Sequence, residues 1–239
     1  QSASGSDKFA GTGWIGRYLD TTCNHDHKPH FALQCDENIC LAMRGEKTTG
    51  LTIRDPNAVA RPLLQSVNKK LIASSYSSEP DNYTNFLYKS ICDVYSSFDY
   101  LKEHYKINSN KITYPPVPFS QKLKAISNLI NGDSETRIYY VSLSNFDTHT
   151  NQFHFQNKLL KDLSEGLYSF TYDLKKNHRL NEVCIMVFSE FGRRVSENAN
   201  GGTDHGSANN VFLFGNKLKK KGIFNEMPDL TNIENNNLK

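Results

Sequence analysis

Three short segments of the chain carry side chains that can bind a divalent metal ion. The ligand types, in chain order, are Asp147 and His149, then Glu190, then Asp204 and His205. Carboxylate oxygens together with imidazole nitrogens suit Zn²⁺, Mn²⁺ or Fe²⁺. Each residue alone could instead cap a helix or form a turn. Because all three segments carry ligand types, we expect them to share one metal site.

Two arginines follow the second segment closely. Arg193 and Arg194 lie within four residues of Glu190, and a planar guanidinium binds phosphate or sulfate oxygens through two parallel hydrogen bonds. We expect one of them to stabilise an anion in the same site. The alternative for either arginine is a surface ion pair with Glu197 or Asp173.

Predicted strands flank these segments. The β-branched and aromatic run at 137–143 and the apolar run at 183–188 precede the first two segments, and the run at 210–214 follows the third. Apolar residues at helical spacing predict a helix over 155–174. This order predicts a βαβ unit of a parallel sheet whose second strand is buried on both faces. Ligands bind beyond the carboxyl ends of such strands, which would bring the segments together.

The first half of the chain is predicted to be more irregular. Apolar spacing predicts helices at 13–19, 84–105 and 123–130, and the proline-rich segment 114–118 reads as an extended linker. Short strands are expected at 39–43 and 51–56, inside a peripheral β excursion that spans 31–60. The residues from 225 onward are polar, and we expect them to fray.

Composition excludes several classes of protein. The chain has 239 residues with 28 Lys and Arg against 25 Asp and Glu, a formal net charge of +3. A hydrophobic content of 37%, with 12 Tyr and 14 Phe, excludes disorder of the whole chain. The small charge argues against nucleic-acid binding. No stretch approaches the roughly 20 apolar residues that span a bilayer. We expect one globular domain or part of a larger one.

A second cluster of metal-ligand types lies near the N-terminus. Its members are Cys23, His25, His27, His30, Cys35 and Cys40. Their order matches no common zinc-module spacing, so a variable surface loop is the better interpretation. One disulfide within this region would suit an exported protein, but the sequence does not establish it.

Several motifs in a specific order resemble a known bacterial family. They are the segment 13–19, the segment 146–149 with Gln152, the segment 188–195 with Glu197 and Asn198, and the segment 202–206. Over residues 11–222 the chain resembles the domain of unknown function 1501, regarded as sulfatase-like within the alkaline phosphatase superfamily. The resemblance implies a three-layer α/β/α sandwich with a mostly parallel sheet. It also implies export to the periplasm or the exterior, and a two-metal site at the strand ends, where a Ser or Thr nucleophile attacks a phosphate or sulfate ester.

The resemblance also assigns roles to residues. Asp147 and His149 resemble the superfamily's Asp and His pair after a central strand, Glu190 lies where the superfamily has an Asp, and His205 resembles its final metal-binding His. The Asp-x-His spacing here is shorter than the superfamily's Asp-x-x-x-His, and Phe191 takes the place of a ligating His. These departures leave room for one metal ion or none.

The resemblance further implies that a segment carrying the nucleophile region precedes this chain. We therefore expect residues 1–222 to form a partial domain, incomplete at both ends, followed by a polar tail at 223–239. We expect this chain alone to be poorly stable and inactive.

The leading functional hypothesis is a hydrolase of phosphate or sulfate esters that depends on a divalent ion (Zn, Mn, Fe, Mg or Ca). Its ligands would be Asp147, His149, Glu190 and His205, with Asp204 as a ligand or orienting partner. The alternative is a non-catalytic exported binding or structural protein that keeps the fold. In that case Glu190 would pair with an arginine and Asp204 with His205. A redox or zinc module built on residues 23–40 is the weakest hypothesis.

Overall fold

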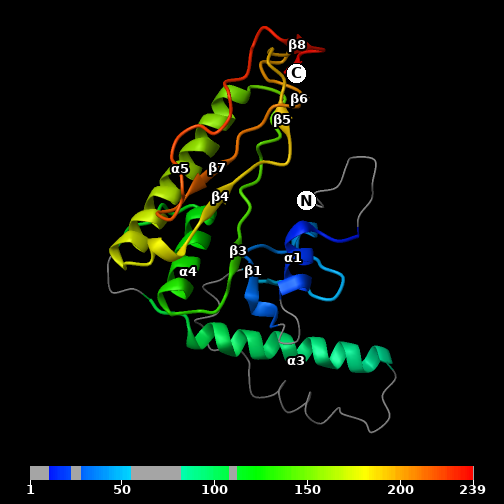
Figure 1. Ribbon diagram of the computed structural model, residues 1–239, viewed down its shortest axis with the longest axis vertical. Coiled ribbons are helices and arrows are strands. Elements are labelled where there is room, and N and C mark those ends of the chain that lie inside the picture. The colour runs from blue at the N-terminus through cyan, green and yellow to red at the C-terminus, as the bar shows by residue number, and fades with distance from the viewer. Residues whose placement is uncertain (1–10, 23–27, 55–81, 108–111, 239) are drawn as a thin grey trace. The chain divides into compact units, whose positions relative to one another are not determined.

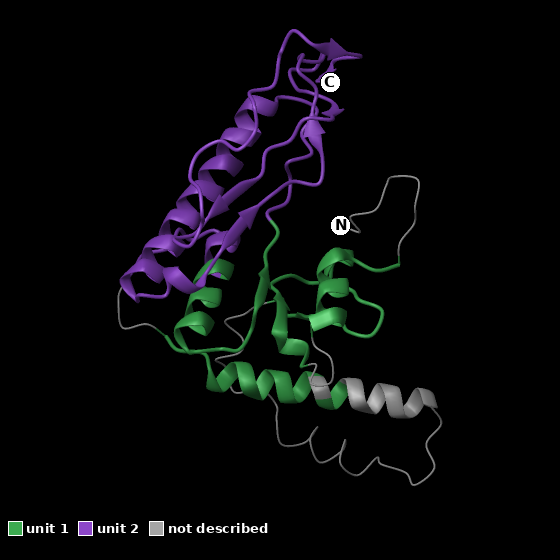
Figure 2. Ribbon diagram, viewed as in Figure 1, with its two compact units in different colours: residues 1–111, 122–142 green, residues 112–121, 143–239 purple. Residues whose placement is uncertain are grey.

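The computed structural model describes residues 11–22, 28–54, 82–107 and 112–238 (Figure 1). The chain divides into two compact units (Figure 2). Unit 1 comprises residues 1–111 and 122–142, and unit 2 comprises residues 112–121 and 143–239. Helices and a small parallel sheet make the fold mixed α/β.

Unit 1 is built on a small parallel sheet. Its strands are β1 (Ala32–Gln34), β2 (Leu51–Thr52) and β3 (Ile138–Tyr140). β1 lies between the other two, with Leu33 opposite both Leu51 and Tyr139. The strands predicted near 51 and 138 are confirmed. The segment 31–60, expected as a peripheral excursion, supplies the middle strand of this sheet.

Helices cover both faces of the sheet in unit 1. Successive strand residues point to opposite faces, so Leu33 and Tyr139 face one side while Ala32 and Ile138 face the other. The first face packs against Leu101 of α3 (Asn82–Glu103) and Leu129 of α4 (Pro118–Asn131). The second packs against Ile15 and Leu19 of α1 (Trp14–Thr22) and Met43 of η2 (Leu41–Met43). The predicted helices at 13–19, 84–105 and 123–130 are confirmed.

The strand predicted at 39–43 is wrong. Met43 N–H donates to the Cys40 carbonyl oxygen at 3.1 Å and Arg44 N–H donates to that of Leu41 at 3.1 Å, which closes the 3-10 turn η2. The turn buries Ala42 and Met43 against α1. Burial of two adjacent side chains in one cluster requires a turn, because a strand would send them to opposite faces.

The surface loop predicted for the Cys and His cluster is wrong over residues 30–35. His30 lies in the turn η1 (Pro29–Phe31), is 5% exposed, and stacks on the ring of Tyr100 with centroids 4.0 Å apart. Cys35 is fully buried, and burial raises the pKa of its thiol to about 12. Such a thiol stays protonated and is a poor metal ligand. Cys23, His25 and His27 lie outside the described residues.

Unit 2 carries one long helix and several short antiparallel ladders. The helix is α5 (Gln152–Lys176), followed by the turn η4 (Leu180–Glu182). The pairs are β4 (Ile185–Val187) with β7 (Phe212–Phe214), β5 (Gly192–Arg193) with β6 (His205–Gly206), and β8 (Ile233–Glu234) with β9 (Asn237–Leu238). The predicted helix at 155–174 and the strands near 185 and 212 are confirmed.

The predicted βαβ unit is wrong, because β3 and β4 lie in different sheets. The predicted environment of the strand at 183–188 is also wrong. The partner of β4 is the antiparallel strand β7, and Met186 is 44% exposed between two half-buried neighbours. An apolar run by itself does not distinguish a strand buried on both faces from one buried on a single face.

The C-terminal tail is more ordered than expected, since β8 and β9 form a hairpin within the segment expected to fray. Among the described residues, no helix combines the length and apolar character needed to cross a membrane.

Candidate metal centre

Three predicted ligands meet in unit 2. Asp147 and His149 lie in the loop 143–151, and His205 begins β6. Asp147 Oδ1 lies 3.0 Å from His149 Nε2 and 2.6 Å from His205 Nε2. One ligand atom from each residue lies within 4.8 Å of the other two. All three side chains are exposed, so the group opens to solvent. We call these residues the Asp–His–His triad.

The hairpin of β5 and β6 places His205. In this ladder Gly192 lies opposite Gly206 and Arg193 lies opposite His205. The ring of Phe191 stacks on that of His205, with centroids 4.1 Å apart and planes 18° apart. The Phe191 ring therefore supports the His205 ring from one side.

The connection between β5 and β6 holds the loop that carries Asp147 and His149. Gln152 Oε1 accepts hydrogen bonds from the backbone and the hydroxyl of Thr203, at 2.6 and 2.8 Å. The N–H groups of Asn151 and Gln152 donate to the carbonyl oxygens of Asn200 and Gly201, at 3.1 and 2.9 Å. These bonds attach the start of α5, and with it the loop 143–151, to the segment before β6.

A glycine at position 202 allows this close approach. A Cβ atom at Gly202 would overlap the carbonyl group of His149, so no side chain fits there without a shift of the backbone. The neighbouring Gly201 has a positive φ of 69° but more space, because a Cβ atom added there would lie 3.7 Å from its nearest neighbour. Glycine is therefore favoured at position 202 because the His149 backbone lies close, and at position 201 because the backbone has a positive φ.

Asp204 lies behind His149, outside the triad. Its Oδ1 lies 3.4 Å from His149 Nδ1 and accepts a 3.2 Å hydrogen bond from Asn198 Nδ2. The hydrogen bonds from Asn198 and then His149 hold the pKa of Asp204 below its ordinary value. The hydrogen bond from His205, followed by the charge of that ring and the bond from His149, lowers the pKa of Asp147. Both carboxylates are therefore stabilised in the charged form that binds a cation.

The two arginines differ in what they contact. The Arg193 guanidinium is partly buried, donates to the carbonyl oxygens of Phe146 and Thr203, and lies over the Phe191 ring at 5.1 Å. It thus links the loop of Asp147 to the segment before β6. Arg194 is more exposed, with a nitrogen 3.9 Å from Asp204 Oδ2.

Glu190 does not join the group. Its side chain is exposed, and among the described residues the ligand group comprises Asp147, His149 and His205. Of the five predicted metal ligands, the structure thus brings three together and places Asp204 as the partner of His149. The alternative pairing of Asp204 with His205 differs from the structure, where His205 bonds to Asp147.

The donor set of the triad fits a divalent ion. Two imidazole nitrogens and one carboxylate oxygen are ligands that Zn²⁺, Mn²⁺ and Fe²⁺ accept. Three protein ligands leave coordination positions open, as catalytic sites require. A carboxylate behind one His matches the outer partner that ligating histidines usually have.

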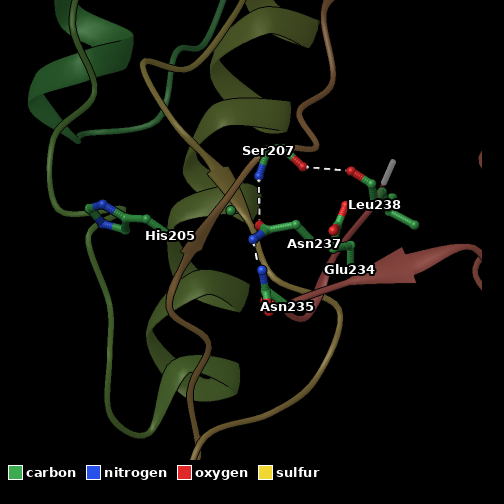
Figure 3. Close-up of a pocket in the computed structure, with 7 residues that line it drawn as sticks. His205, Ser207, Glu234, Asn235, Asn237 and Leu238 are labelled. Atoms are coloured by element: carbon green, nitrogen blue, oxygen red, sulfur yellow. Dashed lines mark hydrogen bonds between the residues drawn. The ribbon is translucent and has the colours of Figure 1, made fainter.

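A hollow of about 590 Å³ lies between the segment that begins with His205 and the β8–β9 hairpin. Its lining comprises His205, Gly206, Ser207, Glu234, Asn235, Asn237 and Leu238. Figure 3 shows hydrogen bonds that link Ser207 to the β8–β9 hairpin, with the His205 side chain pointing away from them. Sequence patterns did not indicate that the tail contacts Ser207, two residues after His205. Asn198 was noted only as part of a family motif and was given no role in the site, although an Asn shortly before two glycines is a turn signal.

Comparison with known proteins identifies a family without assigning an activity. No curated protein and no solved structure matches the chain. The family described as protein of unknown function (DUF1501) matches residues 2–237. The matched range includes all three residues of the triad, and by this match the chain belongs to the DUF1501 family.

Proposed function

We propose that this protein is a metal-dependent hydrolase of phosphate or sulfate esters. The observation that carries the proposal is the convergence of Asp147, His149 and His205, whose ligand atoms lie within 4.8 Å of one another. These residues would hold one divalent ion. With two imidazoles, the set favours Zn²⁺, Mn²⁺ or Fe²⁺ over Mg²⁺ or Ca²⁺. When bound, such an ion acts as a Lewis acid toward ester oxygens.

The remaining residues have separate roles in this proposal. Asp204 accepts from His149 Nδ1 and so directs Nε2 toward the ion. Arg194, exposed beside Asp204, is the arginine with freedom to reach an ester anion. Arg193 is engaged with two carbonyl oxygens, so its contribution is to hold the loop of Asp147.

The family resemblance supports two further parts of the proposal. We propose an α/β/α sandwich of the alkaline phosphatase type, which agrees with helices on both faces of the small parallel sheet in unit 1. We also propose that the protein acts outside the cytoplasm. Fractionation of the source cells, followed by detection with an antibody, tests the second part, and recovery only in the cytoplasm would contradict it.

Metal and anion binding by the full chain test the proposed function. We expect one Zn²⁺ or Mn²⁺ per chain after reloading and dialysis, measured by elemental analysis. The loaded chain should bind inorganic phosphate or sulfate, the products of the reaction, more tightly than the metal-free chain does. Hydrolysis of 4-nitrophenyl phosphate and 4-nitrophenyl sulfate gives the reaction itself. Failure to retain any divalent ion ends the metalloenzyme proposal.

One observation favours a second, non-catalytic function. Asp147 bonds to both imidazoles, and His205 also stacks on Phe191, so these contacts can close the loops without an ion. The H205A variant separates the two functions. A structural pair should lose the same thermal stability with and without metal, whereas a metal site should lose the stabilisation that added metal gives.

A further inference from the structure

We propose that Asn198 is a positioning residue that holds His149 as a metal ligand from two sides. The inference rests on the proposed metal site. Asn198 lies in the connection between β5 and β6 and belongs to none of the three ligand positions. Its proposed role rests on the hydrogen bonds that its side chain makes to the His149 backbone and to Asp204, which faces the His149 ring.

The amide nitrogen of Asn198 makes two bonds that bear on one histidine. Nδ2 donates to the carbonyl oxygen of His149 at 3.1 Å and to Asp204 Oδ1 at 3.2 Å. The same Asp204 oxygen lies 3.4 Å from His149 Nδ1. One side chain therefore fixes both the backbone of His149 and the carboxylate that its ring faces.

The amide oxygen of Asn198 is occupied separately. Oδ1 accepts from the N–H groups of Asn200 and Gly202, at 2.9 and 3.1 Å. The Asn198 N–H donates to the carbonyl oxygen of Gly202 at 2.7 Å. These bonds close a turn around the two glycines. The oxygen thus shapes the turn, while the nitrogen reaches the metal ligand and its partner.

The separate contacts of the amide nitrogen and the amide oxygen explain how Asn198 would affect metal binding. A proton on His149 Nδ1, directed at Asp204, leaves the lone pair of Nε2 available for an ion. Asn198 keeps Asp204 in place for that contact and prevents the His149 backbone from moving away. Outer partners of this kind change metal affinity by about 10- to 100-fold.

The N198D variant separates the two halves of the amide. Aspartate keeps an oxygen for the N–H groups of Asn200 and Gly202, so the turn can persist. The other carboxylate oxygen would face Asp204 and the His149 carbonyl, where donors are needed. We therefore expect N198D to weaken Zn²⁺ binding at least as much as N198A, by about 10- to 100-fold. A residue that only forms the turn would tolerate N198D.

The matched control is N209D, in the same unit. Asn209 also uses both ends of its amide, donating to the Ser189 carbonyl oxygen and accepting from the Ser189 hydroxyl, each at 2.9 Å. It contacts no member of the triad through these bonds. We expect its Zn²⁺ affinity to stay within about twofold of wild type.

The measurements are Zn²⁺ affinity by competition with a chromophoric chelator and the visible spectrum of the Co²⁺-loaded full chain, with urea unfolding in EDTA as a folding check. N198D should lower affinity and change the Co²⁺ spectrum. In a D204N background, N198A should add less than it does alone, because both act through His149. Wild-type affinity in N198D would overturn the role of Asn198 while leaving the metal site intact. Absence of Zn²⁺ and Co²⁺ binding in wild type would overturn the metal site and this role together.

Discussion

Two carboxylates in this protein are each held by several donors, but the donors differ in kind. In unit 1, Asp20 of α1 accepts from the N–H groups of Glu46, Lys47 and Thr48, at 2.7, 3.2 and 2.8 Å, and from the Thr48 hydroxyl at 2.7 Å. In unit 2, Asp147 accepts from the imidazoles of His149 and His205. The donors to Asp20 are three backbone N–H groups and one hydroxyl of a single loop, whereas the donors to Asp147 are two imidazole side chains.

The pKa values of both carboxyls lie below the ordinary value, for different reasons. Desolvation raises the pKa of Asp20, but the hydrogen bonds from Thr48 and from the three backbone N–H groups outweigh it. For Asp147 the bond from His205 is the largest cause of the lowered pKa. The pKa is lowered in both carboxyls, but this shared direction does not mean that the two carboxylates have the same role.

The difference lies in what each donor can do without its proton. A backbone N–H has no lone pair to offer a cation, so the three N–H contacts of Asp20 anchor the loop 45–48 to α1 and supply no metal ligand. An imidazole nitrogen coordinates a metal once its proton leaves. Asp147 and its two partners can therefore exchange their mutual hydrogen bonds for bonds to an ion.

The largest expected effect on Zn²⁺ affinity comes from a comparison of two single variants, in each of which one of these aspartates is replaced by asparagine. D147N should lower Zn²⁺ affinity by more than about 100-fold, since loss of an outer partner alone costs up to that amount. D20N should leave the affinity unchanged, because the hydrogen-bond partners of Asp20 are residues 46–48. Isothermal titration of the full chain with Zn²⁺ measures both. Equal losses in the two variants would show that the proposed distinction is wrong.

The second effect concerns stability. D20A should lower the free energy of unfolding by about 1–2 kcal/mol, because the buried Thr48 loses its acceptor while the exposed N–H groups of Glu46 and Lys47 can bond to water. The loss should be the same with Zn²⁺ and with EDTA. Urea unfolding, monitored by circular dichroism, measures it. D147A in EDTA is the control and should cost less, because its carboxylate is exposed.

Local sequence patterns predicted the elements better than their pairing. The apolar stripes that mark α3, α4 and α5 lie within one segment each, so their spacing is visible in the sequence. The position of β1 between β2 and β3 depends on contacts with residues about 20 and 105 positions away along the chain, which no local pattern records. Likewise, the apolar run around β4 indicated its position but not its antiparallel partner or its exposed face.

The residues of the candidate site also differ in how well the sequence predicted them. Asp147, His149 and His205 were predicted from residue type and from their places beside strands. Glu190 has an equally suitable side chain and an equivalent place after a strand, yet the backbone path after β4 leaves it outside the group. Asn198 has no ligand chemistry to mark it, and its role depends on reaching His149 across 49 positions. Residue type identifies candidates, and the loop path selects among them.

The third effect tests whether the position of His149 depends on the packing at Gly202. G202A places a methyl group onto the His149 carbonyl oxygen, so the loop must move. We expect about a 10-fold loss of Zn²⁺ affinity, in the range for disturbed outer contacts. G201A, at a φ of 69°, should instead cost about 1–2 kcal/mol of stability through backbone strain and leave the affinity near wild type. If G201A weakens Zn²⁺ binding as much as G202A, packing against His149 is not the cause.

The fourth effect is the pH dependence of the Asp20 anchor. A carboxyl whose folded pKa is lowered stabilises the fold above its unfolded pKa and loses that contribution as pH falls through the folded value. The stability difference between wild type and D20A should therefore be full at about pH 6 and shrink below about pH 4, the ordinary range for aspartate. Urea midpoints in EDTA across this acidic range measure it, and a difference that grows on acidification would contradict the sign.

The smallest effect is expected at Arg194. Its contact with Asp204 is long, at 3.9 Å, and both side chains are more than 40% exposed, so solvent and salt screen the pair. R194A should change the free energy of unfolding by less than about 0.5 kcal/mol and Zn²⁺ affinity by less than about threefold. Phosphate binding to the loaded chain should nevertheless fall, because the guanidinium is proposed to bind the anion.

The matched variant R193A completes this test. Arg193 holds the carbonyl oxygens of Phe146 and Thr203, so its loss should disturb the Asp147 loop and lower Zn²⁺ affinity, unlike R194A. Phosphate affinity measured at saturating Zn²⁺ separates the two arginines: a decrease in R194A assigns anion binding to the exposed arginine. If R194A binds phosphate like wild type, Arg194 has no part in the site, and anion recognition must come from the metal or from other residues.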